Sequence, residues 1–178
     1  QTDDIVPASM PLTQFASTAL DRVGPQISAV AAKIARFAET DLVCYRAEAP
    51  QSLAEAELAA WGPLLEWVET TFGARLIVTH GITPIPQPSA AVARLRAAVV
   101  AFEAFPLAAL SGATAATGSV VIGLALAHGR ISGDQAADAA QVDEVFQMQR
   151  WGAEADAEAQ LARQRAELCA IERFLALL

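Results

Sequence analysis

Lysine is almost missing from this chain of 178 residues, and the charge balance is acidic. Lys33 is the one lysine among twelve basic residues, whereas twenty residues are acidic, so the net charge is −8. A nucleic-acid interface needs clustered cations that neutralise phosphates and release counterions. The composition therefore excludes nucleic acid as a partner.

Cysteine and histidine are also scarce, which removes most side chains that bind metals or act as nucleophiles. Cys44 and Cys169 lie far apart and form no CxxC pair, so we expect free thiols in a reducing compartment. His80 and His128 each lack a second ligand at helical spacing. We expect a buried structural thiol at Cys44, a turn at His80 and a helix end at His128. We predict no catalytic residue, no metal and no cofactor.

Few aromatic residues, 6%, accompany a high hydrophobic content of 54%, most of which is alanine, leucine and valine. Alanine is the strongest helix former and is depleted in strands. The length suits one hydrophobic core. We therefore predict a mainly α fold, a multi-helix orthogonal bundle formed by residues 11–178. Residues 1–10 lack an initiator methionine, and we interpret them as a connector from a missing upstream domain.

Apolar residues at three- and four-residue spacing predict the helices. The expected helices begin at residues 11, 27, 52, 88, 105, 132 and 155. Ser52 and Glu55 fit a capping box, and Pro63 should kink or divide the helix that follows. We interpret residues 41–47 as a buried connector. β-branched residues between positions 75 and 86 predict a small β-hairpin.

The longest apolar run covers residues 105–127 and has the length of a membrane span. Small polar residues interrupt it and no Trp or Tyr belt flanks it, so a buried central helix is the better interpretation. Within it, SGATAATGS at residues 111–119 lacks the lysine of a phosphate-binding loop. Small residues for close helix packing explain the segment. The alternative is a small-molecule-binding or enzymatic helical domain with a pocket lined by residues 111–119.

Acids, amides and one tryptophan gather in residues 142–158 over about two helical turns. One interpretation is a solvated helix with a half-buried tryptophan. The other is a recognition surface, because partly exposed tryptophan beside charged residues is enriched at protein interfaces. Composition does not choose between them, and a purely structural helical scaffold is a third alternative.

Five motifs, in this order and covering nearly the whole chain, resemble the assembly chaperones for the α subunit of the ATP synthase catalytic head. They are MPLT at residues 10–13, DLVCYRAEAP at 41–50, WGPLLEW at 61–67, ATGS at 116–119 and VDE…Q…WG at 142–152. The family is found in mitochondria and in α-proteobacteria. It also has a small β-rich domain before the helical one, which this chain does not show.

The resemblance implies a protein that binds the unassembled α subunit, prevents its aggregation and delivers it for assembly with the β subunit. It implies no nucleotide, no metal and no enzyme activity. We expect a monomer that is not embedded in a membrane and lies in the bacterial cytoplasm, or in the mitochondrial matrix for eukaryotic relatives. The expected partner-binding residues are Asp143, Glu144, Gln149, Trp151 and Glu154, whereas Arg46 is expected to brace the structure.

Overall fold

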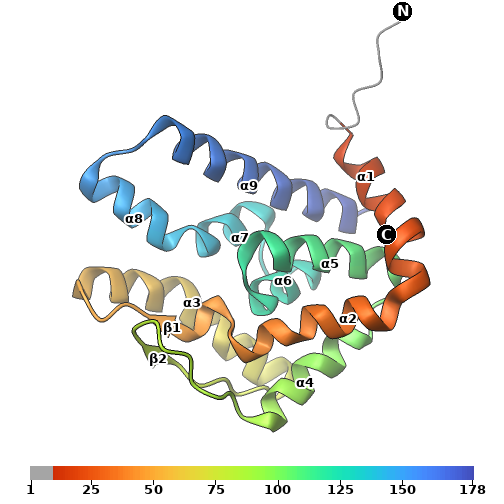
Figure 1. The fold of residues 1–178 in the computed structure, drawn as a ribbon, viewed down its shortest axis with the longest axis horizontal. Helices are drawn as coiled ribbons and strands as arrows, with labels where there is room; N and C mark the ends of the chain where they lie inside the picture. Colours follow the sequence, from red (N-terminus) through yellow and green to blue (C-terminus); the bar gives the residue numbers. More distant parts are fainter. Residues whose placement is uncertain (1–9) are drawn as a thin grey trace, which may run out of the picture.

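Helices form most of the computed structural model, which describes residues 10–178 (Figure 1). The first half contains α1 (Pro11–Thr18), the π-helical turn η2 (Ala19–Val23), η3 (Gly24–Gln26), α2 (Ile27–Ala35), η4 (Arg36–Glu39), η5 (Leu42–Cys44), β1 (Tyr45–Arg46), α3 (Gln51–Phe72), β2 (Thr79–His80) and α4 (Ser89–Val100). The second half contains α5 (Ala104–Thr117), α6 (Val120–Ala127), α7 (Gly133–Ala140), α8 (Val142–Trp151) and α9 (Ala155–Leu175). The mainly α fold is confirmed. Residues 1–9 lie outside the described residues, so the connector and the domain boundary at residue 11 stay predictions.

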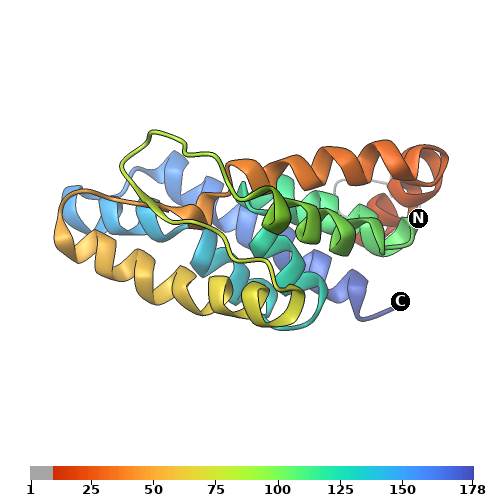
Figure 2. The ribbon, with the colours of Figure 1, turned by 90° about the horizontal axis from the view of Figure 1, so that it is seen from below.

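The central helices are α5 and α6, and the other helices surround them (Figures 1 and 2). On one side, α9 packs against α1, α5 and α7, and on another α2 lies beside α4. The long helix α3 contacts α8 and the short strand β1. This arrangement leaves α8 and the start of α9 at one end of the bundle, away from the centre.

The apolar run at residues 105–127 is buried as expected, but it is two helices instead of one. Gly118 ends α5 in the left-handed conformation, with φ of 67°. The Ser119 hydroxyl then accepts a hydrogen bond from the Ile122 amide and begins α6. A glycine C-cap followed by a serine N-cap is a strong local stop-and-start signal. No helix within residues 10–178 has both the length and the apolarity to cross a membrane.

The β-hairpin predicted at residues 75–86 is wrong. One strand of that segment, Thr79–His80, pairs in parallel with Tyr45–Arg46 from the connector before α3. The Gln87 side chain meanwhile bonds to the amide and the carbonyl of Ile77, at 2.8 and 2.9 Å. This amide supplies the backbone bonds that the second strand of a hairpin would have made.

The structure contains a capping box at α7 and lacks the one predicted at α3. Ser132 and Gln135 form the complete box at the start of α7. At α3 the predicted box is wrong, because the helix begins at Gln51 and the Glu55 carboxylate accepts from the Gln51 amide at 2.7 Å.

The expected breaks within helices also differ from the observed ones. Pro63 does not divide α3, which runs continuously through it. The helix predicted over residues 132–151 is instead divided at Gln141, with φ of −107° and ψ of 11°. The buried Gln141 side chain turns toward α9, so tertiary hydrogen bonds accompany a break that the local sequence does not predict.

Candidate partner-binding site

The helix α8 is the least buried helix at this end of the molecule. None of its side chains is fully buried, and it packs mainly against α3. A cavity opens on each of its two sides, and Gln147 lines both. A helix held along one edge only is well placed to contact another molecule.

The first cavity, which we call the α8/α9 groove, encloses about 340 Å³ between the facing sides of α8 and α9. Its lining residues are Glu144, Gln147, Met148, Trp151, Gly152, Glu154, Ala157, Gln160, Leu161 and Gln164. Trp151 is 72% exposed, an unusual position for a large aromatic side chain. The groove thus combines apolar surface, amides and two carboxylates.

Hydrogen-bonded amides form the inner wall of the α8/α9 groove. Gln141 donates to the Leu161 carbonyl at 2.9 Å and to the Gln164 amide oxygen at 2.7 Å. Gln164 donates in turn to the Ala116 carbonyl of α5 at 2.6 Å. Because buried, satisfied networks are rigid, this chain of bonds fixes α9 and the start of α8 to the core.

The second cavity, which we call the α3/α8 cavity, encloses about 640 Å³ between α3, α8 and the short strands. Charged and polar side chains on its lining include Arg46, Glu57, His80 and Asp143. Ile82, on the loop after β2, is 94% exposed at its edge. Charges of both signs line this cavity, whereas the α8/α9 groove is lined by carboxylates and no cation.

Glu57 and Asp143 form a carboxyl pair that joins α3 to α8. The buried Glu57 carboxylate accepts from the Ala47 amide at 2.8 Å, and the Asp143 side chain lies beside it. Within residues 10–178, the buried Asp143 Oδ1 has no hydrogen-bond donor. Burial first, and then the Asp143 charge, raise the pKa of Glu57, while the Ala47 amide and Arg46 oppose the rise.

Arg46 is a structural cation beneath this pair. It is 5% exposed and donates to the carbonyls of Val43 at 2.8 Å and Tyr45 at 2.6 Å. Its guanidinium carbon lies 5.0 Å from the centroid of the Trp61 ring, a cation–π arrangement. These contacts agree with the bracing role expected for Arg46.

The five residues predicted to bind a partner do not all lie at one site in the structure. Glu144, Trp151 and Glu154 meet in the α8/α9 groove. Asp143 points to the α3/α8 cavity, and Gln149 is exposed but lines neither cavity.

Sequence reasoning missed the α9 wall of the groove and the Glu57 partner of Asp143. Ala157, Gln160, Leu161 and Gln164 follow helical spacing, which was the available signal for a shared face. Nothing in the sequence marks Glu57 as buried, because an acid within an exposed helical pattern is ordinarily solvated.

Cys44 and His128 lie in packed surroundings. Burial, with the charge of Asp41, raises the pKa of Cys44 to about 12, so this thiol is a poor nucleophile, as expected. His128 packs against the rings of Trp67, Phe72 and Phe102, and burial lowers its pKa. In residues 10–178, no three His, Cys, Asp or Glu side chains are grouped as a metal site requires.

The segment at residues 111–119 is close-packed and lines neither cavity beside α8. Ala113, Thr114, Thr117 and Ser119 are all at most 4% exposed. A Cβ added at Gly112 would lie 3.2 Å from both Ile171 and Phe15. Small residues here allow helices to approach, which counts against a pocket at this segment.

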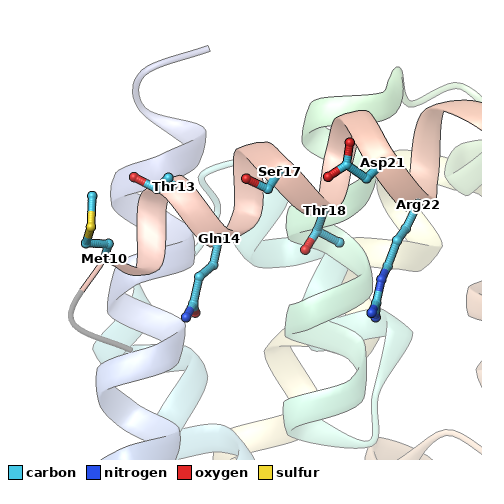
Figure 3. A pocket seen from close by; sticks show the side chains of 7 residues that line it. All are labelled: Met10, Thr13, Gln14, Ser17, Thr18, Asp21 and Arg22. Carbon is cyan, nitrogen blue, oxygen red and sulfur yellow. The ribbon is translucent and has the colours of Figure 1, made fainter. Parts of the chain in front are cut away.

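A further hollow of about 620 Å³ lies along α1 and η2 (Figure 3). Its lining runs from Met10 to Arg22 along one continuous helical stretch. The side chains drawn there come from that stretch alone, so no second element among residues 10–178 provides a facing wall. We assign no site to it.

Comparison with known proteins agrees with this architecture. A family model described as ATP12 chaperone protein matches residues 1–69. The crystal structure of Atp12 from Paracoccus denitrificans aligns with a TM-score of 0.95 and 41% identity, over 99% of this chain and 76% of that chain. A protein of Agrobacterium tumefaciens, whose description is also that of a chaperone, aligns with a TM-score of 0.91 and 32% identity, over 97% of this chain and 65% of that chain. The family and the Agrobacterium protein are described as chaperones and not as enzymes, and the chain belongs to the ATP12 chaperone family.

Proposed function

We propose that this chain is an assembly chaperone for ATP synthase. It binds the unassembled α subunit of the catalytic head, prevents its aggregation and delivers it for assembly with the β subunit. Membership of the ATP12 chaperone family supports the chaperone role. The observation that carries the proposal is the α8/α9 groove, where an exposed tryptophan lies beside two carboxylates.

The chemistry of the groove suits a temporary complex. A chaperone must cover client surface without outcompeting the final partner, so a moderate and partly polar interface is expected. Trp151 supplies apolar contact area, and Glu144 and Glu154 supply charges that salt screens. We propose that Asp143 and Gln149 extend this surface around α8. The chain acts as a monomer in the bacterial cytoplasm.

Co-expression with the α subunit tests the proposal. We expect the two proteins to co-elute in size-exclusion chromatography at physiological salt, and we expect less aggregated α subunit than without this chain. Glu144→Lys reverses a charge in the groove and should weaken the complex about tenfold, since close charge pairs couple by 1.5 kcal/mol or more, about tenfold in affinity.

Glu66→Lys is the matched control, because Glu66 is exposed on α3 and lines neither cavity. It makes the same charge change and should leave the complex intact. If the wild-type chain neither co-elutes with the α subunit nor reduces its aggregation, the proposed function is wrong.

A further inference from the structure

Two helical stripes face each other across the α8/α9 groove without a helix between them. On α8, Glu144, Gln147, Met148 and Trp151 recur at positions i, i+3, i+4 and i+7. On α9, Ala157, Gln160, Leu161 and Gln164 repeat the same spacing. Each helix packs closely against other elements, α8 against α3 and α9 against α7, but the two stripes do not close on each other.

We propose that the α8/α9 groove binds one short amphipathic helix of the client that carries lysine or arginine beside its apolar stripe. This inference rests on the proposed function, and it specifies the part of the client that is recognised. An apolar side chain lies against Met148, Trp151 and Leu161, and a cation lies near Glu144 and Glu154.

The walls of the groove favour a helix over an extended strand. A strand is recognised by unpaired main-chain groups at a sheet edge, whereas a helix is recognised by side-chain anchors at i, i+3, i+4 and i+7 in a groove between helices. Both walls here are helices whose backbone groups are largely paired internally. A volume of about 340 Å³ is near the lower end of the range for ligand pockets, about 300–1,000 Å³, so it takes a few anchor side chains.

The charges of the groove specify a basic occupant. Glu144 and Glu154 line it, and none of the ten lining residues is a cation. Asp156 and Glu158 follow in the first turn of α9. An acidic segment would be repelled here, and a neutral apolar one would leave the carboxylates partly desolvated without a partner.

The groove is built before the client arrives. The bonds from Gln141 to Gln164 and from Gln164 to Ala116 hold its inner wall to the core. A preformed site avoids the entropic cost of ordering side chains on binding, so a few anchors are enough for useful affinity.

A substitution that fills the groove with a large side chain tests this inference most directly. Ala157 is an exposed lining residue, so Ala157→Trp occupies the groove without disturbing the core. Ala159→Trp is the matched control, since Ala159 is exposed on the same helix and does not line the groove. Equal circular dichroism and melting temperatures verify that both variants fold.

The probe is a set of overlapping 18-residue peptides that covers the α subunit sequence, measured for binding to the three proteins. We expect the wild-type chain and Ala159→Trp to bind a small group of peptides with lysine or arginine and apolar residues at helical spacing. Ala157→Trp should bind them at least tenfold more weakly. A proline placed at the centre of a bound peptide should also reduce its affinity tenfold, because proline breaks the helix.

The whole α subunit distinguishes this inference from the proposed function. If the α subunit co-elutes equally with the wild-type chain and Ala157→Trp, or if the bound peptides are acidic or tolerate the central proline, the groove inference is wrong and the chaperone role stands. If the α subunit does not bind the wild-type chain at all, both are wrong.

Discussion

The α5–α6 junction and the α8–α9 hairpin are both helix breaks at a glycine with positive φ, but they differ in burial. At the first break, φ is 67° at Gly118, and the neighbouring Ser119 is fully buried. At the second, φ is 94° at Gly152, and every residue from 149 to 160 is exposed. Gly118 is in the left-handed helical region, with ψ of 13°, whereas Gly152 has a ψ of 158°. The first break closes the core, and the second presents a groove. Substitutions at the junction should change stability, and substitutions at the hairpin should change binding.

The largest effect on stability is expected at Asp41, which ties the connector to the α5–α6 junction. Its carboxylate accepts from the Val43 amide at 3.2 Å and the Val121 amide at 3.1 Å, and it is fully buried. Asp41→Ala leaves both amides unpaired, and each unsatisfied buried group costs about 1–3 kcal/mol. We expect urea unfolding at pH 7 to show a loss of about 3 kcal/mol. Asp21→Ala, an exposed control, should change little.

The stability that Asp41 contributes should also depend on pH. Burial raises the pKa of Asp41 from 3.8 to about 6, although hydrogen bonds from Ser119 and backbone amides oppose the rise. The folded state then holds a proton that the unfolded state loses near pH 4. The proton-linked part of the contribution is complete below pH 4 and is lost as the pH rises through 6, whereas the bonds from the Val43 and Val121 amides remain. The stability difference between the wild type and Asp41→Ala should therefore shrink from pH 4 to pH 7, and a constant difference would contradict this assignment.

An intermediate effect is expected from Gly123→Ala, in the packed region. A Cβ at Gly123 would lie 2.7 Å from Thr114 Oγ1 and 3.1 Å from Leu110. Overpacking of this kind costs about 1–3 kcal/mol, which thermal unfolding would detect. Gly62→Ala is the matched control in α3, where the new Cβ meets Leu58 at an ordinary 3.6 Å. The control should gain about 0.5–1 kcal/mol from helix propensity. Equal changes in both variants would show that packing at α5–α6 is not tight.

A smaller effect, of the opposite sign, is expected at the Glu57–Asp143 pair. Glu57→Gln keeps an acceptor for the Ala47 amide and donates permanently to Asp143 Oδ1. Because the pKa of Glu57 is raised, the wild type loses stability as the pH increases, whereas the variant does not. We expect Glu57→Gln to be the more stable protein at pH 8 by less than about 1.5 kcal/mol, the value of one net hydrogen bond. A lower melting temperature than the wild type at pH 8 would mean that Glu57 is ionised in the fold.

Local sequence patterns predicted the elements that depend mainly on neighbouring residues. Helical spacing identified most helices, and the helix expected from residue 132 begins there, with Ser132 as its N-cap. Two of the failures share one cause, which is contact between residues far apart in sequence, whereas the missed break at Gly118 and Ser119 and the wrong capping box at α3 are local. The β1–β2 pairing joins Tyr45 to Thr79, and the α7/α8 break accompanies bonds from Gln141 to α9.

The candidate site was also predictable only where its residues lie close together in the sequence. Glu144 and Trp151 share a face of α8 by spacing alone. The opposite wall comes from α9, and the partner of Asp143 comes from α3. Only the tertiary structure brings these elements together, so sequence reasoning found one side of each cavity.

The smallest effect on stability is expected at Trp151, which lies next to the exposed helix break at Gly152. A side chain that is 72% exposed contributes little to folding, because most of its apolar area remains in water in the folded state. We expect Trp151→Ala to change the free energy of unfolding by less than about 0.5 kcal/mol. Under the proposed function, it should nevertheless weaken α subunit binding by about 2 kcal/mol, roughly thirtyfold, as truncation of a central aromatic anchor does. Urea unfolding and titration with the α subunit measure the two quantities on one preparation. A variant that loses stability and keeps its affinity would reverse the assignment, because Trp151 would then belong to the packing of the bundle and not to the α8/α9 groove.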